Sequence, residues 1–207
     1  MEKPTFSKSR VIGFSDAVFS VAMTLLVLEV AIPTYTSFSK SGTIGVLLER
    51  IPNFIGFALS FFVTAFYWID YMRISKYVSE FDMKALWINI FILFFVVFLP
   101  FSTAFYVNGF NLVGPFVLYS LNLSFIAFVI YLLIKHITKK EQESTGLTKL
   151  KGKWLAVRSL NTFLVWLVAG IFAFFLPMTS RFFFVLIFIL DPIIDKYYKK
   201  KFDKQNL

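Results

Sequence analysis

The sequence predicts an all-α membrane protein with six transmembrane helices in a single domain, residues 1–207. Hydrophobic residues make up 58% of the chain and charged residues only 16%, which is more apolar than a typical soluble domain. The apolar residues also gather in six runs separated by short polar segments. Together, this composition and this spacing indicate an integral membrane protein.

Five of the six runs are long enough to cross a bilayer, because roughly 20 helical residues span a hydrocarbon core of about 30 Å. Asp191 and Pro192 interrupt the sixth run, which we predict as a crossing from the charge pattern. Pro100 predicts a kink in the third run. The predicted spans are approximately residues 11–32, 51–72, 85–107, 112–134, 155–178 and 180–194.

The basic residues predict the orientation, since cytoplasmic loops carry an excess of Lys and Arg. Of the 21 basic residues, 18 lie before the first run, after the second, between the fourth and fifth, or after the sixth, and the other three are Lys40, Arg50 and Arg181. Six crossings with both termini in the cytoplasm fit this alternation. The net charge of +9 therefore reflects topology, and we expect no nucleic-acid partner. A cleaved signal peptide is the alternative for residues 1–32, but no A-x-A site follows.

The first run carries a carboxylate, Asp16, inside its apolar segment. On a helix with about 100° per residue, Val21, Leu25 and Leu28 form one stripe, and Asp16 lies about 140° from Val21. Charged groups in a membrane usually face the protein interior and pair there. We therefore predict that Asp16 bonds to the cytoplasmic end of another helix. The candidates are Trp68, Asp70, Tyr71, Arg73, Trp87, Asn89, Arg158 and Asn161.

The apolar stripe has three interpretations at this level: it faces lipid, fills a bundle core, or lines a pore as a hydrophobic constriction. A proton- or cation-coupled secondary transporter that uses Asp16 is the main functional alternative to a channel. No paired Gly/Pro-broken helices or internal repeats favour it. A non-conducting scaffold or lipid-binding protein also stays open.

Catalysis is not expected. The chain has no cysteine, and its one histidine, His136, lies in the polar segment 135–153. Two membrane aspartates, Asp16 and Asp191, could in principle hydrolyse a bond, but the GxGD context of such enzymes is absent. We expect no cofactor and no bound metal.

The segment RVIGFSD, residues 10–16, resembles the RxxxFSD motif that begins the transmembrane protein 175 family of potassium channels. AVFSVAMTLLVLEV, which follows, resembles the family's first helix, and WINIFILFFVVFLPFSTAFY, residues 87–106, resembles the third. Trp68 and Arg73 resemble the end of the second helix, where the family commonly has W-x-x-H. Tyr71 stands at the histidine position, so we expect no histidine bond to the motif and expect Asp70 to alter the network.

The resemblance implies a potassium-permeable cation channel in the plasma membrane, with four copies around a central pore lined by the first helix. Its partners would be potassium ions, the lipid bilayer and other copies of the chain. The pore would have no TVGYG filter. The resemblance assigns the hydrophobic constriction to Val21, Leu25 and Leu28, and a selectivity-associated position to Thr24. It assigns the network that fixes the first helix to Arg10, Phe14, Ser15, Asp16 and Trp68.

Overall fold

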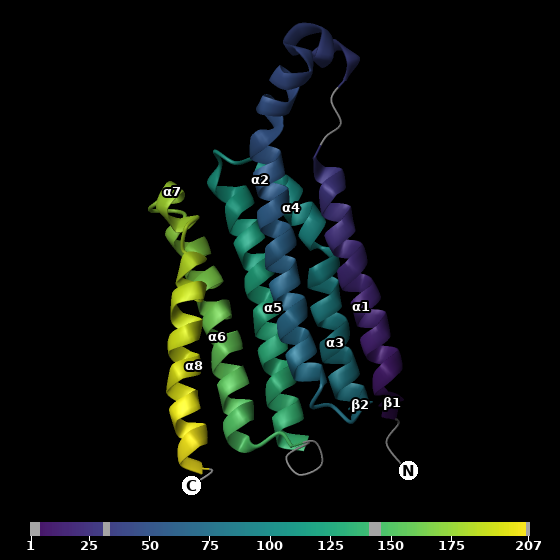
Figure 1. Ribbon diagram of the computed structural model, residues 1–207, viewed down its shortest axis with the longest axis vertical. Coiled ribbons are helices and arrows are strands. Elements are labelled where there is room, and N and C mark those ends of the chain that lie inside the picture. The colour runs from purple at the N-terminus through teal and green to yellow at the C-terminus, as the bar shows by residue number, and fades with distance from the viewer. Residues whose placement is uncertain (1–4, 31–33, 141–145, 206–207) are drawn as a thin grey trace.

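The computed structural model describes residues 5–30, 34–140 and 146–205, which form a bundle of long helices running roughly side by side (Figure 1). The elements in chain order are β1 (Thr5–Ser7), α1 (Lys8–Leu25), the 3-10 helix η1 (Leu26–Glu29), α2 (Tyr35–Ser75), β2 (Glu80–Asp82), α3 (Met83–Val97), α4 (Leu99–Asn108), α5 (Val113–Lys140), α6 (Lys149–Phe172), α7 (Pro177–Ser180) and α8 (Val185–Gln205). The strands and the C-terminal end of α8 lie at the same end of the bundle (Figure 1), which we call the ribbon end.

Five segments of the described chain are long and apolar enough to cross a membrane. They overlap the first five predicted runs and are Lys8–Leu28, Tyr35–Ser75, Met83–Asn108, Val113–Lys140 and Lys149–Phe172. The predicted sixth span, 180–194, overlaps α8 only in part, because α8 begins at Val185 and continues through Pro192 to Gln205. A sixth crossing therefore stays a prediction. The last residues of the first predicted span, 31–33, lie outside the described chain.

Two predicted runs differ from the helices that form: the second is longer than predicted, and the third is divided into two helices. α2 is much longer than the predicted span 51–72, and its backbone breaks at Gly42, whose φ of 63° belongs to the left-handed region that suits glycine. The part of α2 before this break, residues 35–41, bends past the end of the bundle opposite the ribbon, at the top of Figure 1. The third run divides into α3 and α4, with Pro100 in the first turn of α4. This confirms the predicted interruption, because proline cannot donate a backbone hydrogen bond inside a helix.

Helix α5 lies at the centre of the bundle and packs against α6, α3 and α4 (Figure 1). Small residues bring α5 and α6 close together at two levels. A Cβ atom added at Gly152 would lie 2.3 Å from Thr138 Cγ2, and one added at Gly170 would lie 2.7 Å from Ser120 Oγ. Close backbone approach at small residues is the usual way in which helices gain contact in a membrane, where the hydrophobic effect adds little.

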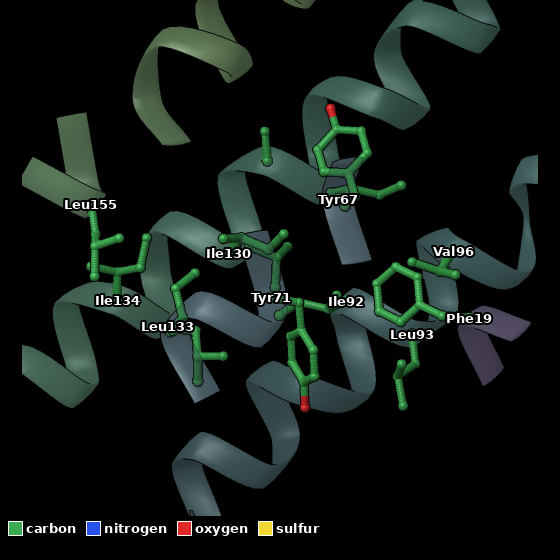
Figure 2. Close-up of a cluster of buried hydrophobic side chains, with 14 of the residues drawn as sticks. Phe19, Tyr67, Tyr71, Ile92, Leu93, Val96, Ile130, Leu133, Ile134 and Leu155 are labelled. Carbon is green, nitrogen blue, oxygen red and sulfur yellow. The ribbon is translucent and has the colours of Figure 1, made fainter. Parts of the chain in front are cut away.

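The core joins side chains from most of the long helices (Figure 2). Phe19 of α1, Tyr71 of α2 and Ile92 of α3 are each fully buried, and Leu133 of α5 packs in the same cluster. The outer surface, in contrast, carries many large apolar side chains that are exposed, as expected for contact with lipid tails or other copies.

A short antiparallel ribbon that was not predicted joins the start of α1 to the start of α3. Its register pairs Thr5 with Asp82, Phe6 with Phe81 and Ser7 with Glu80. Each strand has only three residues, too few to show the alternation by which strands are recognised in a sequence.

Asp82 connects the ribbon to α3 and α5. Its carboxylate caps α3 by accepting a hydrogen bond from the Ala85 backbone N–H at 2.7 Å, and His136 Nε2 lies 3.0 Å from both of its oxygens. Lys140 Nζ is 3.7 Å away. Burial disfavours the charged form of this carboxyl, but the bonds from Ala85 and His136 and the charge of Lys140 outweigh burial and hold the pKa of Asp82 below its ordinary value.

Asp82 should therefore make stability depend on acid pH. A carboxyl whose pKa is lowered by folding stabilises the native state above its unfolded pKa of about 3.9, and this contribution is lost as the pH falls through the folded pKa. We expect Asp82→Asn to unfold at a lower temperature at pH 7 but to lose less stability on acidification, and Asp82→Ala to lose about 1 kcal/mol more through the missing cap. Thermal unfolding in detergent measures both. Asp203→Asn, at an exposed carboxylate on α8, is the control, and equal acid sensitivity of all variants would contradict the assignment.

Candidate functional site

Helix α1 has one face against the bundle and one face free of protein contacts. Val11, Ser15, Phe19 and Ala22 are buried, and their spacing of three or four residues places them on one side of the helix. α1 lies at the edge of the bundle, farthest from α8 (Figure 1).

The predicted constriction residues all lie on the free face. Val21 is 55% exposed, Leu25 40% and Leu28 70%, and Thr24 between them is also exposed. Leu28 belongs to η1, which continues α1 without a break. The Thr24 hydroxyl donates a hydrogen bond to the Val21 carbonyl at 2.8 Å, so its proton is held by its own helix.

Asp16 points away from this face and bonds to α2. Trp68 Nε1 donates to Asp16 Oδ1 at 2.9 Å. This contact confirms the prediction that the carboxylate has a partner on another helix, and it identifies Trp68 as that partner. The donor is neutral, so among the residues that the structure describes Asp16 is held by a hydrogen bond and not by an ion pair.

Ser15 is the point at which three helices meet. Tyr71 Oη of α2 donates to Ser15 Oγ at 2.9 Å, and Asn89 Nδ2 of α3 donates to the same oxygen at 3.0 Å. Ser15 in turn donates to the Val11 carbonyl at 2.9 Å. A hydroxyl offers one proton and two lone pairs, and all three are used here. Ser15 and Tyr71 are fully buried, and Asn89 is nearly so.

The residues predicted for this network lie in different surroundings. Asp16 bonds to Trp68 and Ser15 bonds to Tyr71 and Asn89, whereas Arg10 is exposed and Phe14 is 64% exposed on the outer side of α1. The arrangement adds Tyr71 and Asn89, both of which the sequence offered only as possible partners of Asp16. The feature of the sequence that pointed to them is that each is a polar side chain in an otherwise apolar run, near the ribbon end of its helix.

The expectation that Asp70 would alter this network is wrong. Asp70 Oδ1 accepts from Arg73 Nη1 at 3.1 Å, one turn along α2. The reason is helical geometry: Asp70 lies about 100° from Tyr71 and about 160° from Trp68 around α2, so it faces away from α1. Tyr71 instead fills the histidine position with a donor of its own.

No catalytic arrangement forms from the candidate residues. Asp16 bonds to Trp68, whereas Asp191 accepts from Asn161 at 3.0 Å and pairs with Arg158 at 2.8 Å. Among the residues that the structure describes, no group of three or more His, Cys, Asp or Glu side chains could hold a metal ion.

Comparison with known proteins gives matches at the level of family, sequence and structure. The family described as the endosomal/lysosomal potassium channel TMEM175 matches residues 10–100. A potassium channel of Chamaesiphon minutus is 35% identical over 105 residues, which is 50% of this chain and 52% of that protein. A potassium channel of a Chryseobacterium species is 26% identical over 202 residues, 97% of this chain and 100% of that protein. The chain thus covers about half the length of the first relative and all of the second.

A solved structure shares the fold. The crystal structure of a lysosomal potassium-selective channel TMEM175 homologue from Chamaesiphon minutus aligns with a TM-score of 0.76 at 25% identity. The alignment covers 92% of this chain and 97% of that chain.

We expect the Ser15 node to contribute to stability in a non-additive way. Tyr71→Phe keeps the ring against Phe19 but removes one donor, and should cost about 1 kcal/mol. Ser15→Ala leaves two buried donors without an acceptor and should cost more, about 1–3 kcal/mol. The double variant should then be less destabilised than the sum of the two single variants.

Thermal or denaturant unfolding of the purified variants in detergent measures this cycle. Tyr35→Phe, at a tyrosine that is 86% exposed, is the matched control and should leave stability unchanged. Strict additivity, or a Tyr71→Phe variant as stable as Tyr35→Phe, would show that the node does not hold α1.

Proposed function

We propose that this chain, whose resemblance to the transmembrane protein 175 family is confirmed by its family, sequence and structural matches, is a subunit of a potassium-permeable cation channel. The observation that carries the proposal is the free apolar face of α1, with Val21, Leu25 and Leu28 exposed on a helix whose other side is fixed by hydrogen bonds. A helix that is anchored on one side and free on the other is suited to line a pore.

The pore is formed by several copies of the chain in this proposal. One α1 supplies one stripe, and a closed ring of stripes requires a cyclic homo-oligomer. The family resemblance implies four copies. The small residues Gly13, Ala17 and Ser20 are also exposed on α1 and would let neighbouring copies approach closely near the ribbon end.

Conduction through such a ring is passive and only modestly selective. Apolar side chains supply no oxygen atoms to replace the water around an ion, so the ion passes with part of its hydration shell. Thr24 is the polar exception beside the constriction. Its hydroxyl proton is bonded to the Val21 carbonyl, which leaves the oxygen lone pairs available to a cation.

A coupled transporter that uses Asp16 is less well supported. Such a mechanism needs a carboxylate that is reached from the transport path, whereas Asp16 accepts a hydrogen bond from Trp68 and lies about 140° around α1 from Val21. We place the channel in the plasma membrane with the lysine-rich ribbon end in the cytoplasm, in keeping with the positive-inside rule.

Potassium flux in liposomes tests the function. Purified protein in potassium-loaded liposomes should release potassium down its gradient without any counter-substrate, and bilayer recordings should resolve single-channel events with current proportional to the driving force. A flux that strictly requires a proton or sodium gradient, with no single-channel events, would favour the transporter instead.

Leu25→Asn tests the pore face. If Leu25 lines the constriction, an amide there hydrates it and lowers the barrier; a decrease of about 1 kcal/mol raises unitary conductance about fivefold. The control is Leu164→Asn, which makes the same change at a leucine that is 46% exposed on α6. Equal conductance of the two variants would place Leu25 against lipid.

A further inference from the structure

A cavity of about 310 Å³ is lined by residues of α2, α6 and α8 and by Phe184. Helices α6 and α8 lie on the side of the bundle away from α1 (Figure 1). The three helices each contribute one face to its wall, at positions spaced by three or four residues. A volume of this size is within the range of small-molecule sites. The proposed ion path along α1 does not include it.

One half of the cavity is aromatic. The rings of Phe66 and Phe188 meet edge to face at 5.5 Å, Phe184 meets Phe188 at 6.5 Å, and Phe184 stacks on Trp166 at 6.4 Å. Trp166 is buried at the inner end of this row, whereas Phe66 and Phe188 are about half exposed at its outer end. The aromatic half is therefore open to the apolar surroundings of the bundle.

The other half is charged and lies nearer the ribbon end. Arg158 is only 14% exposed, and its guanidinium bonds Asp195 at 2.6 Å and Asp191 at 2.8 Å. Asp70 and Arg73 line the same half and pair with each other at 3.1 Å. Three carboxylates thus face two guanidinium groups, so the charged side chains that line the cavity carry one net negative charge.

The net negative charge of the lining determines the sign of the ligand, and the aromatic half determines its shape. Two carboxylates share the one guanidinium of Arg158 in a partly buried site, so a cation that enters is favoured over an anion. Aromatic faces also attract ammonium groups. A simple ion would leave the apolar half unfilled, whereas an alkyl chain fits it.

We propose that this cavity binds an amphiphile made of one primary ammonium group and an apolar chain. The ammonium lies among Asp70, Asp191 and Asp195, and the chain follows the row of phenylalanines toward the bilayer interior. This chemistry has two sources, the ethanolamine headgroup of a phospholipid and a free long-chain amine.

Native mass spectrometry of the full-chain oligomer in a neutral maltoside detergent tests the proposal. Phosphatidylethanolamine, phosphatidylglycerol with the same acyl chains, and dodecylammonium are added separately. We expect adducts of at least one ammonium probe at concentrations about tenfold below those that phosphatidylglycerol requires, a difference of about 1.4 kcal/mol. Preference for the phospholipid identifies a lipid source and preference for dodecylammonium a free amine. Equal binding of all three probes, or no binding, overturns the proposal.

Two pairs of variants locate the site. Asp70→Asn makes the lining of the cavity neutral overall and should weaken the ammonium adduct about tenfold, whereas Asp203→Asn, outside the cavity on α8, should not. Val63→Trp fills the cavity and should abolish the adduct, whereas Phe62→Trp, at the neighbouring exposed position, should preserve it.

A different result would overturn the proposal. If the wild type takes up no probe and Val63→Trp breaks the oligomer, the cavity is filled by a second copy of the chain and not by an amphiphile. Because the assay measures adducts and not flux, its failure leaves the proposed channel function standing.

Discussion

The arrangement of α1 depends on a single buried hydroxyl, that of Ser15. It accepts hydrogen bonds from Tyr71 and Asn89 on two other helices and donates one within α1. In a bilayer the hydrophobic effect cannot press α1 onto the bundle, because lipid tails are as apolar as its side chains. Directional hydrogen bonds and close packing must set its rotation instead. The rotation of α1 decides which of its side chains are exposed. Because the side that carries Ser15 is turned into the bundle, the side that carries Val21, Leu25 and Leu28 is turned outward.

The donors to Ser15, and the Trp68 donor to Asp16, are neutral, which has a physical consequence. Trp68, Tyr71 and Asn89 carry no charge near neutral pH, whereas an imidazole at the Tyr71 position would change its charge between pH 5 and 8. Tyr71 therefore supplies a donor to Ser15 whose charge does not change over this range of pH. The charged groups of α2 are kept apart from the anchor, since Asp70 and Arg73 face the other side.

Much of this arrangement could be predicted from the sequence. Run length and the wheel of α1 predicted the first five apolar helices, the turn of Asp16 away from the stripe, and its bond to another helix. Asn89 could only be named among several polar residues, because the choice depends on how α3 is rotated against α1. The three-residue strands left no periodic signal. α8 continues past Pro192, and Asp191 and Asp195 on either side of this proline pair with Arg158 of α6, a contact between residues far apart in the chain that run length does not reveal.

The ribbon also limits how α1 can move. β1 leads directly into α1, β2 leads directly into α3, and the two strands pair over three residues. α1 cannot slide along its axis by one residue without breaking this pairing, because a slip would turn each strand side chain to the other face. The ribbon therefore fixes the position of α1 along its axis relative to α3, and with it the level at which Leu25 and Leu28 lie in the bundle.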